Sequence, residues 1–223
     1  MSPRGTAPAS RPDARAGQPD RLGGWSGLGF VVALLASEAA LTLPDETASA
    51  ERVAQFYSAH RAVIIVLQVV GFIAAALLAV YAVRLRAVDR TLGNCLFAVA
   101  VLSLAPGLLT AVLAATADTG NPESAGRLNQ LLPRADDLLF AAILVFGAAV
   151  VRLHRTNRWV ALLGGLVAAL GLLRLIDESI TGRGTFDSAA PIAFVVLIAT
   201  MSVLSLRGRL GVPNPPPAGT RRS

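Results

Sequence analysis

The sequence is poor in charged residues, lysine and cysteine. Charged residues make up 15% of its 223 positions, whereas soluble domains are about a quarter charged. Lysine is absent, so all 20 basic residues are arginines. Cys95 is the only cysteine and can form no internal disulfide, which excludes a disulfide-stapled domain. Hydrophobic residues reach 54% and the mean hydropathy is +0.60, which excludes a disordered chain and indicates a membrane protein.

Six apolar blocks are long enough to cross a bilayer. A hydrocarbon core of about 30 Å takes about 20 apolar residues in a helix, because backbone groups in lipid must be satisfied internally. The sequence therefore predicts an all-α fold, a six-helix transmembrane bundle over 25–206. Its expected spans are 25–43, 62–83, 91–116, 133–153, 159–177 and 188–206. The tails 1–24 and 207–223 are rich in Pro, Gly and Arg and are expected to be disordered.

A cleaved signal peptide is the alternative for the first block. Ala48, Ser49 and Ala50 form a small-x-small pattern after an apolar run. Cleavage there would leave five spans.

Arginine placement predicts the orientation. Short loops rich in arginine stay in the cytoplasm. In the six-span arrangement 14 arginines lie with the two tails and the loops near 84–90 and 152–158, and six lie on the other side with ten acidic residues. Both termini are therefore expected in the cytoplasm. Topology and anionic lipid account for the positive charge, so nucleic acid is not an expected partner.

The segment after the first block predicts a short amphipathic helix. Ser49 is a suitable N-cap, and Val53, Phe56, Tyr57 and His60 recur at helical spacing. We expect this helix to lie at the outer interface between spans one and two. The loop 118–133 has a turn signal at 119–122, then a helical turn over 127–132 that Pro133 is expected to stop.

Two features of the spans predict their packing. Pro106 and Gly107 should kink the third span. Gly164, Gly165 and Gly171 in the fifth span are spaced for close helix packing.

Several ionisable residues are predicted at one depth in the outer third of the bilayer. Counting about 1.5 Å per residue along each span from its cytoplasmic end places Glu38, Asp137 and Arg174 about 20 Å above that end. Asp136, Arg134 and His60 fall close to that level. The candidate intramembrane polar site therefore consists of Glu38, Asp136, Asp137, Arg174 and His60.

This cluster has structural and functional interpretations. In the structural interpretation, the Arg174 side chain could extend to the lipid headgroups, and the aspartates could sit at the N-terminus of span four, where the helix dipole favours anions. Glu38 could then form an ion pair with Arg174 that joins spans one and five. A substrate, ion or proton site is the functional interpretation. We expect the Glu38–Arg174 pair, with Asp137 as the competing partner for Arg174.

No catalytic or metal-binding motif is present. The sequence lacks a nucleophile elbow, a Walker motif, a zinc-protease motif and a dinucleotide fingerprint. His60 and His154 are expected on opposite sides of the membrane, so they cannot share a metal. We therefore expect no catalytic residues, no metal, no cofactor and no enzyme activity.

The order of features resembles a family of uncharacterised six-span integral membrane proteins of actinobacteria, a domain-of-unknown-function family. The resemblance rests on P-D-E-T-A-S-A-E-R-V-A-Q-F-Y-S-A-H-R at 44–61, R-L-N-Q-L-L-P-R-A-D-D-L-L-F at 127–140, R-T-N-R-W at 155–159 and S-V-L-S-L at 202–206. It would cover about residues 22 to 207. It implies the fold, the topology and a bacterial plasma membrane, and it brings no established activity.

The sequence thus predicts a non-catalytic interaction, sensing or accessory component of the plasma membrane. Its expected partners are the lipid bilayer and other membrane proteins or a second copy of the chain. The alternative is a small-molecule or proton-linked transporter with an outward-facing polar site. The third hypothesis is a receptor whose ligand site is formed by the interfacial helix.

Overall fold

The protein is all-helical wherever its structure is defined. The computed structural model describes residues 20–38, 41, 43–44, 48–153, 157–181 and 189–210, and these ranges contain no strand. The helices are α1 Arg21–Glu38, α2 Ala50–Ala59, α3 Arg61–Leu85, α4 Arg90–Leu102, α5 Leu104–Thr116, α6 Pro122–Asn129, α7 Leu132–Leu153, α8 Arg158–Thr181 and α9 Ala189–Leu206.

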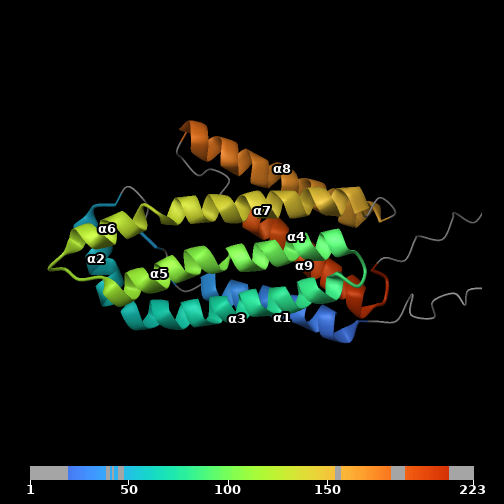
Figure 1. Cartoon of the computed structure of the whole chain (residues 1–223), viewed down its shortest axis with the longest axis horizontal. Coiled ribbons are helices and arrows are strands. Elements are labelled where there is room, and N and C mark those ends of the chain that lie inside the picture. The colour runs from blue at the N-terminus through green and yellow to red at the C-terminus, as the bar shows by residue number, and fades with distance from the viewer. Residues whose placement is uncertain are drawn as a thin grey trace, which may run out of the picture.

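The long helices form an elongated bundle (Figure 1). α1 packs against α3 and α9, α4 packs between α3 and α7, and α8 packs against α7 and α9. Figure 1 shows α1 beginning and α9 ending at the same end of the bundle, with α2 and α6 at the opposite end. α8 leans away from the bundle toward its C-terminal end (Figure 1).

Four helices are long and apolar enough to cross a membrane. They cover 61–85, 90–116, 158–177 and 189–206, where 90–116 joins α4 and α5. These correspond to the second, third, fifth and sixth predicted spans. α1 and α7 occupy the first and fourth predicted blocks, and four charged residues fall within α7 itself.

The first block differs from its prediction at both ends. α1 begins at Arg21, because the Asp20 carboxylate accepts a hydrogen bond from the Gly23 backbone N–H at 3.0 Å and caps the helix. The predicted N-terminal tail therefore extends four residues too far, and its residues 1–19 lie outside the described part. The described helix ends at Glu38, and Leu41 and Leu43 are not helical. Glu38 is the last described residue of this helix.

The third span has a one-residue break at Ser103, whose backbone keeps right-handed helical angles. α4 ends at Leu102 and α5 begins at Leu104, with Ser103 between them. Pro106 has no N–H, so the Leu102 carbonyl four residues earlier loses its usual helical donor. This break lies one turn N-terminal to Pro106 and Gly107, and the kink expected from those two residues stays a prediction.

The predicted amphipathic helix is present as α2. The Ser49 hydroxyl oxygen accepts from the Arg52 N–H at 3.3 Å, which confirms Ser49 as the N-cap. Val53 and Tyr57 are fully buried. They pack with residues of α3, α5 and α6 in a separate apolar cluster, so α2 and α6 form a small cap at one end of the bundle.

The helix over 127–132 is wrong in place and in its stop signal. α6 runs from Pro122, which occupies the first turn, to Asn129. Pro133 lies in the first turn of α7 and opens that helix, because a proline there removes only an N–H that would have no partner anyway.

α7 and α8 cross at glycines. A Cβ added to Gly147 would lie 2.7 Å from the Gly164 carbonyl oxygen, and one added to Gly164 would lie 2.7 Å from Val150 Cγ1. The backbones can approach this closely only because both positions lack a side chain. Gly164 thus has the packing role that its spacing predicts.

Candidate functional site

A cavity of about 310 Å³ lies between α1, α3, α5 and α7. Ligand pockets range from about 300 to 1,000 Å³, so this one suits a small molecule. It is lined from the second half of α1, the first half of α3, the α4–α5 break and the start of α7. It therefore lies in the half of the bundle nearest α2 and α6.

The other half of the bundle is closed by packed apolar side chains. Leu78, Tyr81, Leu85, Leu96 and Met201 are all at most 1% exposed and belong to one continuous core cluster. None of them lines the cavity. The cavity is therefore confined to one half of the bundle.

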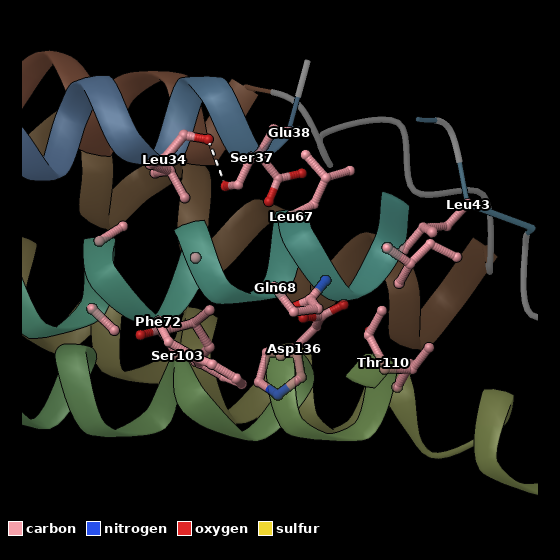
Figure 2. A pocket seen from close by; sticks show the side chains of 18 of the residues that line it. Leu34, Ser37, Glu38, Leu43, Leu67, Gln68, Phe72, Ser103, Thr110 and Asp136 are labelled. Carbon is pink, nitrogen blue, oxygen red and sulfur yellow. Dashed lines mark hydrogen bonds between the residues drawn. The ribbon is translucent and has the colours of Figure 1, made fainter. Parts of the chain in front are cut away.

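Six polar side chains line the cavity, and Figure 2 shows them converging from several helices. Two of them are carboxylates, from α1 and from α7. Among the described residues that line the cavity, none is basic. The polar lining consists of Ser37, Glu38, Gln68, Ser103, Thr110 and Asp136.

The two serines present acceptor atoms. The Ser37 hydroxyl donates to the Leu34 carbonyl at 2.8 Å, as the dashed line in Figure 2 marks. The Ser103 hydroxyl donates to the Ala100 carbonyl at 2.9 Å. Since each hydroxyl carries only one hydrogen, both serine oxygens can offer only lone pairs to the cavity.

Glycine at 107 makes room for the polar wall. A Cβ there would lie 3.1 Å from Gln68 Oε1 and 3.1 Å from Phe72 Cε1. An alanine there would require the Gln68 amide and the Phe72 ring to shift slightly. Gly71 is different, because a Cβ at this cavity-lining position would meet nothing within 4 Å.

Asp137 and Arg174 form a separate ion pair. Arg174 Nη1 lies 3.9 Å from Asp137 Oδ1, and the guanidinium carbon lies 3.7 Å from the centre of the Phe140 ring. The Arg174 side chain is 7% exposed and that of Asp137 is 42% exposed. This contact holds α7 to α8, away from the cavity.

The expected pairing of Glu38 with Arg174 is therefore wrong. The two residues were placed at one depth by counting along their helices, but depth does not specify neighbours. Glu38 lies on α1 beside α3, and α8 packs against α7 and α9 instead.

The five predicted site residues divide among three places. Glu38 and Asp136 line the cavity, and Asp137 and Arg174 join α7 to α8. His60 lies at the α2–α3 junction, where its Nδ1 is 3.0 Å from the Phe56 carbonyl oxygen and its ring lies 4.6 Å from that of Phe56. Their functional role stays a prediction.

Sequence reasoning missed the uncharged half of the lining. Gln68 is a lone amide in the otherwise apolar second block, which is a signal that a search for charges alone overlooks. It also missed Arg61, whose Nε and Nη2 donate to the Ala114 and Ala117 carbonyls, each at 2.8 Å. Arg61 thereby satisfies the exposed carbonyls at the C-terminal end of α5.

Within the described residues, no group of three His, Cys, Asp or Glu side chains is arranged to hold a metal ion. Comparison of the chain with family models, with curated proteins and with solved structures found no match.

Proposed function

We propose that the chain is a six-span protein of the bacterial plasma membrane with both termini in the cytoplasm. Four helices have the length and composition of spans. α1 and α7 pack alongside them, so they would cross the same layer. The arginine-rich turn near 84–90 and the start of α1 lie at one end of the bundle, which fits an inner face.

α2 and α6 are then an extracytoplasmic cap. Apart from Ala59, their exposed positions are polar or charged, and their buried apolar positions pack on the end of α5. A helix of this kind suits the interface on the outer side of the plasma membrane.

The function supported best is non-catalytic sensing or accessory action through a small molecule bound in the outer half of the bundle. The observation that carries this proposal is the asymmetry of the interior. A polar cavity faces the cap end, and a packed apolar core closes the other end. A ligand could enter from the outer side and alter helix packing without passing through.

Filling the cavity tests this proposal. Gly71→Leu would place a side chain in the open space of the cavity. Ala76→Leu places the same side chain at an exposed position of the same helix and is the matched control. A panel of small amines, carboxylates and neutral compounds should include some that raise the melting temperature of the wild type and of Ala76→Leu but not of Gly71→Leu. A panel in which no compound makes this distinction would contradict the proposal.

Transport is the second candidate. The observation favouring it is the break at Ser103, which lies in the cavity wall and is a place where α4 and α5 could bend relative to each other. Uptake of a cavity ligand into sealed vesicles, abolished by Gly71→Leu, would favour transport over sensing.

A further inference from the structure

The charge and hydrogen-bonding character of the cavity indicate its ligand class. We infer that the cavity binds a small organic cation, a primary ammonium group carried on a compact apolar body. This inference rests on the proposed function, because it specifies the ligand of the same cavity.

The described lining holds two carboxylates. Asp136 already takes part in another interaction, so Glu38 is the one offered to a ligand. Glu38 and Asp136 come from α1 and α7 and face one space, and no lining residue is basic among those described. Two arginines of the same half of the bundle are engaged elsewhere, since Arg61 binds the α5 carbonyls and Arg174 pairs with Asp137. A cationic ligand would therefore complement the lining, and an anionic one would be repelled.

The uncharged lining is rich in acceptors. Both serine hydroxyls donate to backbone carbonyls of their own helices and keep only lone pairs for a ligand. Gln68 Oε1 lies next to the position of Gly107, at the cavity wall. An ammonium group has three donors and no acceptor, so it matches this set of oxygens. A carboxylate could accept only from the Gln68 amide nitrogen and the Thr110 hydroxyl, and it has no donor for the serine oxygens.

The rest of the lining favours an organic cation over a metal ion. Phe30, Leu34, Phe72 and Leu139 contribute apolar walls. A volume of about 310 Å³ greatly exceeds what a bare ion occupies. Aromatic rings also attract organic ammonium groups.

Three probes of one shape test the charge preference. They are 2-phenylethylammonium, 3-phenylpropionate and 2-phenylethanol, measured for binding to the full-length protein in lipid nanodiscs, with protein-free nanodiscs subtracted for partitioning into lipid. We expect the wild type to bind the ammonium probe about tenfold or more tightly than the other two, an effect between those of exposed and buried ion pairs. Gly71→Leu should abolish this binding and Ala76→Leu should leave it unchanged.

Removing the charge of Glu38 tests whether this residue causes the preference for the ammonium probe. Glu38→Gln should weaken binding of the ammonium probe about tenfold and leave 2-phenylethanol unaffected. Glu51→Gln, at an exposed acid of α2 outside the cavity, is the matched control. The comparison of probes on the wild type remains decisive even if Glu38→Gln fails to fold.

The possible failures are distinguishable. Binding of 3-phenylpropionate or 2-phenylethanol as tight as that of the ammonium probe, and lost in Gly71→Leu, would overturn the cation preference and leave the proposed function standing. Competition by Na⁺ or Ca²⁺ at concentrations below that of the ammonium probe would overturn the organic class. If none of the three probes binds in a manner sensitive to Gly71→Leu, the inference is overturned, and the wider panel described above decides the proposed function separately.

Discussion

Asp136 and Asp137 are adjacent in the sequence and face different parts of the molecule: Asp136 lines the cavity, and Asp137 lies 3.9 Å from Arg174. Consecutive residues on an α-helix are about 100° apart around its axis, so neighbouring side chains cannot share one face. The first aspartate therefore belongs to the candidate ligand site, and the second joins two helices.

The Asp137–Arg174 contact should appear as a coupling in stability. Asp137→Asn and Arg174→Gln should each lower the free energy of unfolding, and the double variant should lose less than the sum. We expect a coupling of about 0.5–1 kcal/mol, because Asp137 is partly exposed and solvent screens the pair. Unfolding is measured in mixed micelles. The control is the double variant Glu38→Gln with Arg174→Gln, whose loss of unfolding free energy should equal the sum of the two single losses. Coupling in the control and additivity in the first pair would reverse the assignment.

The α7–α8 crossing should not tolerate a methyl group. Gly147→Ala and Gly164→Ala place a Cβ 2.7 Å from a neighbouring atom, which should lower the free energy of unfolding by about 1–3 kcal/mol. Gly165→Ala is the matched control, because its Cβ would lie 3.6 Å from Val151 Cγ2. It should change stability by less than about 0.5 kcal/mol. Equal losses at Gly147 and Gly165 would mean that the helices cross elsewhere.

Much of this fold is predictable from the sequence because its signals are local. The apolar runs place α3, α7, α8 and α9 to within a few residues, and the Ser49 cap and apolar spacing place α2. The neighbours of each helix are a tertiary property that helix counting does not contain. That is why the depth-matched pair of Glu38 and Arg174 fails.

The charged part of the candidate site was also predictable. Its charged members, Glu38 and Asp136, stand out in apolar surroundings. Ser103 does not stand out, and the lone amide of Gln68 is easily overlooked, because single uncharged polar residues are tolerated in spans for structural reasons. Their contribution becomes evident only when several helices bring them to one cavity.

Burial of Tyr57 predicts an alkaline transition in the cap. Desolvation raises the pKa of the Tyr57 phenol from 10.0 to about 12. A group with a raised folded-state pKa contributes stability below its unfolded pKa and loses it as the pH rises toward the folded value. The cap should therefore weaken between pH 10 and about 12.

Tyrosinate absorbance reports this shift directly. The chain has two tyrosines, so Tyr81→Phe leaves Tyr57 as the only signal. We expect an absorbance midpoint near 12 and, in Tyr57→Phe, less alkaline loss of α2–α6 stability. A midpoint near 10.0 would show that Tyr57 is solvated.

Removing the Arg61 side chain should loosen the end of α5. Arg61→Gln loses donors to the Ala114 and Ala117 carbonyls, and hydrogen bonds to charged groups each contribute about 1.5–3 kcal/mol. Hydrogen exchange should become faster over the end of α5 and the following turn. Arg52→Gln, at an exposed arginine of α2, should leave exchange in this region unchanged. No difference between the two variants would contradict the capping role.

Accessibility of the cavity from the outer side is the central claim, and a cysteine at position 71 tests it most directly. In a Cys95→Ala background, Gly71→Cys puts a thiol into the open space of the cavity. Asp118→Cys serves as the outer reference and Val88→Cys as the inner one. Membrane-impermeant methanethiosulfonates carrying a trimethylammonium or a sulfonate group are applied to sealed cells. The account predicts that the thiol at position 71 reacts from outside, like that at 118 and unlike that at 88, and reacts faster with the cationic reagent once each rate is normalised to position 118. Protection of position 71 in sealed cells, with reaction only after permeabilisation, would contradict it.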